Sequence, residues 1–186
     1  MTFAMTPTLA RHTVGVMGSG TAAHHSCARA VGKLLARLGV NVLTGGGGGV
    51  MAAVSGAFVA HPGRRGISIG IIPCASESDR GTPKAGYPNA FIELPIFTHL
   101  PLSGREGTDD LSRNHINVLS CAAIVALPGA EGTASEVTLA VRYGKPVVIY
   151  TPVPDLVRHF PASVERVTGI DQVERFLRRH LAEAIQ

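Results

Sequence analysis

The chain has 186 residues, of which 45% are hydrophobic and 16% charged, a balance that is typical of a globular α/β protein and argues against a disordered or fibrous one. Its net charge of +4 comes without a dense run of Lys and Arg, so no nucleic-acid groove is expected, whereas a small anionic ligand suits this charge. No apolar stretch approaches the ~20 residues of a membrane span, and the first residues lack the apolar core of a signal peptide.

The cysteines and histidines point to a cytoplasmic protein without a metal site. Cys27, Cys74 and Cys121 are widely spaced, odd in number and outside any CxxC or CxxH pattern. We therefore expect reduced core thiols in a cytosol and no disulfide framework. None of the eight histidines belongs to an HExxH or comparable metal-binding pattern.

Short apolar runs alternate with helical patterns along the whole chain. In chain order we expect strand 13–17, helix 22–38, strand 41–43, helix 50–60, strand 66–72, loop 74–89, strand 90–94, loop 95–107, helix 109–120, strand 122–127, helix 134–143, strand 146–150 and helix 171–184. Such alternation predicts an α/β fold, a doubly wound parallel sheet with helices on both faces. We expect one Rossmann-like domain over residues 1–186, in which residues 1–12 form a loose tail.

Three glycine-rich turns, at residues 18–20, 45–49 and 129–132, each follow the carboxyl end of a predicted strand. In an open α/β sheet these ends converge on one crevice, where ligands bind. The first turn resembles half of a dinucleotide fingerprint, but Ala23 replaces the third Gly and no acid ends the second strand, so NAD or FAD is not expected. A GK[ST] loop for ordinary ATP hydrolysis is also missing. This turn serves either as a tight connection or as a contact for phosphate or base.

The five consecutive glycines at residues 45–49 are more than a structural turn needs. Ordering them costs backbone entropy. We interpret them as backbone that comes very close to a ligand, with a merely flexible loop as the alternative.

The third turn is the most informative. It lies in the segment from Pro128 to Glu136, between a buried strand and a helix, where free backbone N–H groups and the helix dipole can hold an anion. Glu136 follows one helical turn later, and an anion site beside a carboxylate suits a phosphorylated sugar. The same spacing also fits a capping box, in which Thr133 caps the helix and Glu136 reaches back to an N-cap amide.

Arg113 lies on the helix that precedes the strand of this turn. On a surface helix an arginine is usually only solvated. A short connection would, however, bring the N-terminal end of its helix, and Arg113 with it, to the same rim of the sheet.

These residues together resemble the superfamily that contains the Lonely Guy (LOG) proteins and the molybdenum cofactor carrier proteins. Its pattern is an Arg-Lys or Arg-Asn pair, a buried strand and then PGGxGTxxE, which here reads Arg113-Asn114, strand 122–127 and the segment from Pro128 to Glu136. Residues 15–20 and 44–51 resemble its two other glycine motifs. The Arg-Asn pair and the compact GTxxE helix that ends in GKPV are closer to the carrier branch.

The resemblance implies a Rossmann-like fold and a set of site residues. It implies catalytic roles for Arg113 and Glu136. The residues it implies for phosphate binding are Gly129, Ala130, Glu131, Gly132 and Thr133. Those it implies for nucleotide binding are Gly18, Ser19, Gly20, Gly45, Gly46, Gly47, Met51 and Asn114. It implies no metal ligand.

Two functions follow from this resemblance. LOG enzymes are phosphoribohydrolases, so the first hypothesis is hydrolysis of the N-glycosidic bond of a nucleoside 5′-monophosphate to free base and ribose 5-phosphate, with no cofactor required. The alternative is a non-catalytic carrier or sensor of molybdenum cofactor (molybdopterin) or a related phosphorylated ligand. Either way the expected partner is a small phosphorylated molecule, not nucleic acid or a membrane, and a homodimer or assembly of dimers is implied.

Overall fold

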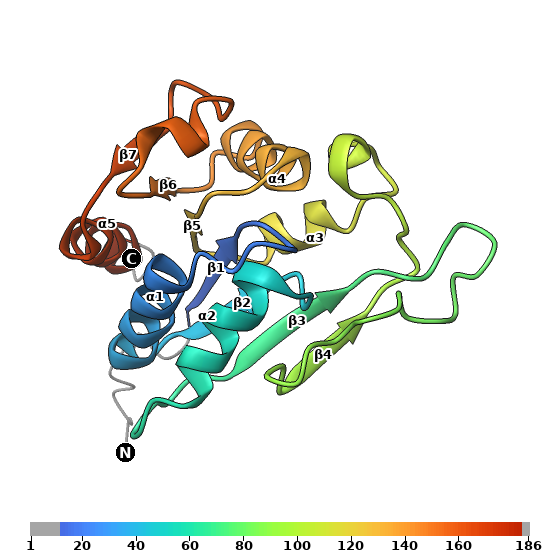
Figure 1. The fold of residues 1–186 in the computed structure, drawn as a ribbon, viewed down its shortest axis with the longest axis horizontal. Helices are drawn as coiled ribbons and strands as arrows, with labels where there is room; N and C mark the ends of the chain where they lie inside the picture. The colour runs from blue at the N-terminus through green and yellow to red at the C-terminus, as the bar shows by residue number, and fades with distance from the viewer. Residues whose placement is uncertain (1–11, 184–186) are drawn as a thin grey trace, which may run out of the picture.

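The computed structural model describes residues 12–183 and shows a seven-stranded, wholly parallel sheet in the order β4-β3-β2-β1-β5-β6-β7 (Figure 1). The strands are β1 (Thr13–Met17), β2 (Asn41–Thr44), β3 (Ser68–Ile72), β4 (Leu94–Phe97), β5 (Ala123–Ala126), β6 (Val147–Tyr150) and β7 (Glu165–Val167). The helices are α1 (His25–Leu38), α2 (Gly49–Val59), α3 (Asn114–Leu119), α4 (Glu131–Arg142) and α5 (Ile170–Glu183), with 3-10 turns η2 (Gly104–Glu106) and η3 (Pro154–Val157). The predicted doubly wound α/β fold is confirmed.

Helices cover both faces of the sheet (Figure 1). Helices α1, α2 and α5 pack on one face, where they bury Leu35, Phe58 and Leu177 in one apolar cluster. Helices α3 and α4 pack on the other face against Met17 and Ile124. The five inner strands therefore read as short apolar runs, because both of their faces are covered, whereas the edge strands β4 and β7 are largely exposed.

The start of α1 differs from the prediction. The hydroxyl of Ser19 accepts hydrogen bonds from the N–H groups of Thr21 (3.2 Å) and Ala22 (2.9 Å), which holds this stretch as a turn. His24 then adopts a left-handed conformation, with φ 41°, immediately before the helix. The helix begins at His25 for this reason, and it ends as predicted at a left-handed Gly39.

Three other elements differ from the prediction by three residues or more at one end at least, and one strand was not predicted. The predicted strand 90–94 overlaps β4 only at Leu94, because Asn89 organises the preceding residues into a turn through hydrogen bonds to the N–H groups of Phe91 and Ile92. Helix α3 is shorter than predicted, and α4 begins three residues earlier than predicted. Strand β7, which lies between the predicted strand 146–150 and the predicted helix 171–184, was not predicted.

The expected N-terminal tail falls, except for its last residue, outside the described residues. His12 belongs to the folded part, since its carbonyl accepts a hydrogen bond from the N–H of Asn41 at 2.9 Å. Over the described stretch, no helix combines the length and apolar character needed to cross a bilayer.

Helix α3 is only six residues long and is held at its carboxyl end by Lys145, which follows α4. The Lys145 ammonium donates hydrogen bonds of 2.9 Å to the carbonyls of both Leu119 and Cys121. A cation at this end of a helix also interacts favourably with the helix dipole. The ends of α3 and α4 are therefore tied together.

Candidate functional site

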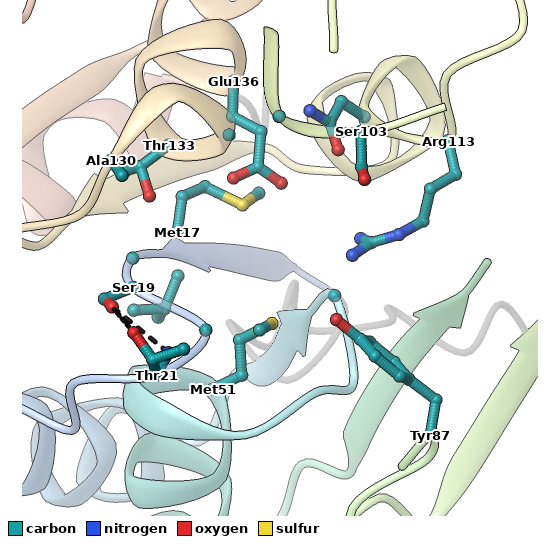
Figure 2. A pocket seen from close by; sticks show the side chains of 17 residues that line it. Met17, Ser19, Thr21, Met51, Tyr87, Ser103, Arg113, Ala130, Thr133 and Glu136 are labelled. Carbon is teal, nitrogen blue, oxygen red and sulfur yellow. Dashed lines mark hydrogen bonds between the residues drawn. The ribbon is translucent and has the colours of Figure 1, made fainter. Parts of the chain in front are cut away.

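A cavity lies at the carboxyl ends of β1, β2 and β5, where the strand order reverses between β1 and β5 (Figure 2). This is the place at which open α/β sheets bind ligands. The cavity has a volume of about 270 Å³. It is lined by Val16, Met17, Gly18, Ser19, Gly20, Thr21, Gly45, Met51, Tyr87, Ser103, Gly104, Arg113, Asn114, Ala130, Gly132, Thr133 and Glu136.

The structure thus brings most of the predicted site residues together. Eleven of the fifteen predicted residues line the cavity, and Arg113 and Glu136 are among them. These eleven residues come from segments far apart in the sequence. Four do not line it. These four are Gly46, Gly47, Gly129 and Glu131.

The turn between β5 and α4 has unpaired backbone N–H groups. Within residues 12–183, no hydrogen bond uses the N–H of Gly129, Ala130, Glu131 or Gly132. The N–H groups of the next two residues already donate to the carbonyl of Ala130. Because Ala130 and Gly132 also line the cavity, their N–H groups and the positive end of α4 form an anion-binding corner.

One residue of this turn, Ala130, departs from PGGxGT, and the variable position holds an acid, Glu131; neither closes the corner. Ala130 stands where the motif has glycine, and its backbone is extended (φ −95°), a conformation that any residue adopts. Glu131 is exposed and does not line the cavity, so its carboxylate lies outside the corner. As the first residue of α4 it complements the helix dipole.

The capping-box interpretation of Thr133 and Glu136 is wrong. Helix α4 begins at Glu131, its N-cap is Ala130, and no side chain of the described residues caps it. Thr133 is therefore already inside the helix. Glu136 points instead into the cavity wall and accepts a hydrogen bond of 2.7 Å from Nδ2 of Asn117, on α3.

Glu136 is buried, with 8% of its surface exposed. Burial raises the pKa of its carboxyl, while the positive charge of Arg113 and the hydrogen bond from Asn117 partly oppose this shift. A buried carboxyl at the edge of a polar cavity, with its pKa moved by a named cation, is typical of functional sites.

Arg113 immediately precedes α3 and is only 6% exposed. Its Nε and Nη1 atoms are buried and have no hydrogen-bond partner within the described residues, and none of the ion pairs there joins it to Glu136. Figure 2 shows its guanidinium directed toward the cavity from the side opposite Met51 and Thr21. A buried cation without partners is costly, and an anionic or hydroxyl-bearing ligand would satisfy it.

The glycines after β1 and β2 are explained mainly by the protein itself. A Cβ on Gly45 would overlap the guanidinium of Arg113, and one on Gly47 would come within 2.7 Å of the Tyr87 hydroxyl. Gly46 (φ 76°) and Gly49 (φ 57°) have left-handed backbones that favour glycine. The expectation that a ligand requires all five glycines is therefore not needed to explain them.

Sequence reasoning missed six lining residues. Val16, Met17 and Thr21 flank a turn that was predicted, but Tyr87, Ser103 and Gly104 come from two long loops without periodicity. Both loops are fixed to the site: Asn89 donates to the carbonyl of Gly47 at 2.8 Å, and Ser135 donates to that of Gly104 at 2.8 Å. Nothing in the sequence marks these contacts.

His159 is a further residue near the anion-binding corner that the sequence did not indicate. Its Nε2 donates to the carbonyl of Gly129 at 3.0 Å. In a trans peptide the C=O and the next N–H point in opposite directions. Holding the Gly129 carbonyl therefore also fixes the direction of the Ala130 N–H.

No group of three or more His, Cys, Asp or Glu side chains within the described residues could hold a metal ion. The polar groups around the cavity are backbone N–H groups, hydroxyls, amides, one carboxyl and one guanidinium. This set suits an organic anion.

Comparison with known proteins places this geometry in a family. The chain belongs to the SLOG cluster4 family, whose model matches residues 11–177. It is 30% identical over 142 residues to an uncharacterized protein of Archaeoglobus fulgidus, an alignment that covers 75% of this chain and 80% of that protein. The LOG-type superfamily inferred from the motifs is confirmed.

Solved structures agree with the carrier branch. The molybdenum cofactor carrier protein of Chlamydomonas reinhardtii is 27% identical, with a TM-score of 0.67, over 92% of this chain and 99% of that chain. The molybdenum cofactor binding protein of Rippkaea orientalis is 25% identical, with a TM-score of 0.66, over 91% and 96%. DNA processing protein A of Helicobacter pylori, a single-stranded DNA-binding protein, is 15% identical with a TM-score of 0.62 over 91% and 81%, and shares the fold alone.

Proposed function

We propose that the protein hydrolyses the N-glycosidic bond of a nucleoside 5′-monophosphate, releasing free base and ribose 5-phosphate. One observation carries this proposal: a buried carboxyl, a buried guanidinium whose Nε and Nη1 have no hydrogen-bond partner among residues 12–183, and a corner of N–H groups unpaired within the same residues all border one cavity. The carboxyl is that of Glu136, and the guanidinium that of Arg113.

These groups support hydrolysis of the N-glycosidic bond by water. The bond between ribose C1′ and the base nitrogen breaks, water adds its oxygen to C1′, and the base leaves with a proton. The transition state carries positive charge on the ribosyl ring, as in other glycoside cleavage. A carboxylate at Glu136 stabilises that charge or orients the water, while the N–H groups near Ala130 and Gly132 anchor the phosphate.

Arg113 has a complementary role in this proposal. Its unpartnered Nε and Nη1 would donate to a ribose hydroxyl or to the phosphate and so orient the sugar. The cavity of about 270 Å³ lies just below the ~300–1,000 Å³ that ligand pockets occupy, so it suits a small ligand such as a nucleoside monophosphate better than a dinucleotide.

The test is release of free base from a panel of nucleoside 5′-monophosphates, followed by chromatography. Glu136→Gln should lower turnover by roughly 10²–10³-fold while substrate still binds, and Arg113→Ala should abolish it. Glu131→Gln, which neutralises an exposed acid on the same helix, is the matched control and should leave turnover unchanged. The proposal fails when wild type and Glu136→Gln are equally inert over the whole panel.

A carrier of a phosphorylated ligand is the second candidate, and the similarity to the Chlamydomonas carrier over 99% of its chain favours it. The unpaired N–H groups of the β5–α4 turn fit the phosphate of molybdopterin, and the Arg113 guanidinium fits its polar ring edge. Mass spectrometry of the small molecule that co-purifies with the protein tests this function. A phosphorylated pterin that stabilises the protein against heat without being turned over would support it, and no stabilisation by any phosphorylated ligand would remove it.

A homodimer is part of the proposal. Leu94, Ile96 and Phe97 of the edge strand β4 are between 42% and 58% exposed. Apolar side chains on a sheet edge are commonly covered by a partner. Light scattering should give the mass of a dimer, and Phe97→Lys should shift it toward the monomer.

A cytoplasmic location completes the proposal. Cys27, Cys74 and Cys121 are all free and buried, a state that a reducing compartment maintains. Fractionation of cells that express the tagged full-length chain tests this location, and recovery in a secreted or membrane fraction would contradict it.

A further inference from the structure

Asn117 is the side chain on α3 that contacts Glu136. It is fully buried and does not line the cavity, so it cannot touch a ligand there. Its Nδ2 donates to Oε1 of Glu136 at 2.7 Å, a short hydrogen bond to a group that can carry charge. Any effect of Asn117 on chemistry in the cavity must therefore pass through Glu136.

The backbone of Asn117 is fixed on both sides. Its N–H donates to the carbonyl of Arg113 at 3.1 Å, and its own carbonyl accepts a hydrogen bond from the thiol of Cys121 at 2.9 Å. Lys145 then holds the carboxyl end of the same helix. Asn117 lies on this short helix and Arg113 is its N-cap, and Lys145 holds the far end of the helix.

One atom of the Asn117 side chain lowers the stability of the folded protein. Its Oδ1 is buried and has no hydrogen-bond partner within the described residues. An unsatisfied buried acceptor lowers stability, and an apolar side chain of the same size would avoid this loss. The amide of Asn117 therefore serves something other than the stability of the core.

The effect of the contact is to make the two oxygens of Glu136 different. Oε1 is occupied by Asn117, while no hydrogen bond within the described residues uses Oε2. Glu136 also lines the cavity, where Figure 2 shows its carboxyl directed inward beside Met17 and Ser103. One carboxyl oxygen is held by the protein and the other is available to the cavity.

We propose that Asn117 is a positioning residue of this site, which holds the Glu136 carboxylate by one oxygen and presents the other to the substrate or the attacking water. This inference rests on the proposed hydrolysis for its consequence on turnover. Its structural part, the hold of Asn117 on the Glu136 carboxylate, can be measured in the ligand-free protein.

The surroundings of Glu136 give the sign of the pH effect. Arg113 faces it from the start of α3, Cys121 lies beyond the end of α3, and the neighbouring turn η2 carries Arg105 and Glu106. Burial raises the pKa of Glu136, and only Arg113 and Asn117 lower it. Without the Asn117 donor, the pKa of Glu136 should rise further, and the acid limb of the pH–rate profile should move to higher pH.

The experiment replaces Asn117 by leucine, which has a similar volume and no donor. Two readouts are used: the pH dependence of kcat/KM on a nucleoside 5′-monophosphate, and the 13C resonance of the Glu136 carboxyl titrated by NMR without ligand. Asn117→Leu should shift both midpoints to higher pH and lower kcat on the order of 10²-fold, with little change in KM. Ile116→Ala, a partly buried neighbour on α3, is the control for a purely structural effect and should move neither midpoint.

The outcomes separate the inference from the proposed function. Unchanged Glu136 titration in Asn117→Leu overturns the inference even when wild type is active. A shifted titration in a protein that hydrolyses nothing supports the hold on Glu136 and removes the hydrolase. Should the leucine variant not fold, Asn117→Asp keeps the side-chain shape, and its second carboxylate should raise the Glu136 midpoint further; no rise would overturn the inference.

Discussion

The turns after β2 and after β5 are both rich in glycine, but Gly45 and Gly47 in the first turn differ from Gly132 in the second. Gly129, also in the second turn, resembles the first pair, because a Cβ there would overlap the Thr133 side chain. Beside Gly45 the space that a side chain would take is occupied by the Arg113 guanidinium, and beside Gly47 by Tyr87. Beside Gly132 the nearest atoms are at 3.7 Å, and its N–H has no partner within residues 12–183. Glycine therefore marks close approach, and only the hydrogen bonds tell whether the approaching group belongs to the protein or to a ligand.

The largest expected effect is a fall in kcat/KM on substitution of Gly45, which tests whether the protein itself requires this glycine. Gly45→Ala should displace the Arg113 guanidinium and lower kcat/KM on the order of 10²-fold, because a misplaced orienting group costs that much. Gly20→Ala is the control, since its Cβ would meet only Met51, at 3.6 Å. Base release from the preferred nucleotide is the measurement. A larger loss of kcat/KM in Gly20→Ala than in Gly45→Ala would mean that a ligand, and not the protein, requires these glycines.

The next effect concerns the β5–α4 turn. Gly132→Val should fit beside Gly104 but crowd the unpaired N–H groups, and hydrogen bonds to a charged group are worth ~1.5–3 kcal/mol, roughly 10–100-fold in affinity. Calorimetric titration with nucleotide and with the corresponding nucleoside separates the two contributions. Only nucleotide binding should weaken, and Gly81→Ala, in a loop with open space around it, should change neither. Equal weakening of both ligands would place the phosphate elsewhere.

A smaller effect is expected on stability, at the carboxyl that follows this turn. Burial raises the folded-state pKa of Glu136, so the stability that its protonated form contributes is present at low pH and is lost as pH rises through that pKa. Glu136→Gln cannot ionise and should therefore unfold at a higher temperature than wild type near pH 7.5, with a gap that narrows toward about pH 4; each 1 kcal/mol corresponds to ~2–4 °C. A gap that does not change with pH would contradict the buried ionised carboxylate.

The smallest effect is expected at His159, which holds the Gly129 carbonyl. Loss of one neutral hydrogen bond, worth ~0.5–1.5 kcal/mol, should weaken phosphate binding roughly 2–13-fold in His159→Ala. His159→Gln retains an N–H donor and should recover most of the affinity. If the glutamine variant binds as poorly as the alanine variant, the hydrogen bond to the Gly129 carbonyl is not what supports phosphate binding.

Much of the fold was predictable, because the information is local. Runs such as residues 122–127 are apolar on both faces, and buried parallel strands require this pattern. The boundaries that failed depend on single side-chain hydrogen bonds, as at Ser19 and Asn89, which periodicity does not encode. Strand β7 pairs only with β6 and is three residues long, too short to leave a pattern.

The candidate site was predictable where a motif carries it and not elsewhere. Arg113 and Glu136 line the cavity because the connection from α3 through β5 to α4 is short. The role of Asn117 could not be foreseen, since its partner lies on another helix. Tyr87 and Ser103 reach the cavity from long loops whose course is decided by tertiary contacts.

Lys145 lies outside the cavity lining, yet it has a bearing on what happens there. Its ammonium holds the carboxyl end of α3, the six-residue helix on which Asn117 lies and which Arg113 immediately precedes. A helix this short has little rigidity of its own and takes its tilt from its anchors. Activity in this protein should consequently be sensitive to substitutions far from any ligand. Lys145→Met, for example, should alter the orientation of α3 without removing any group that contacts the ligand.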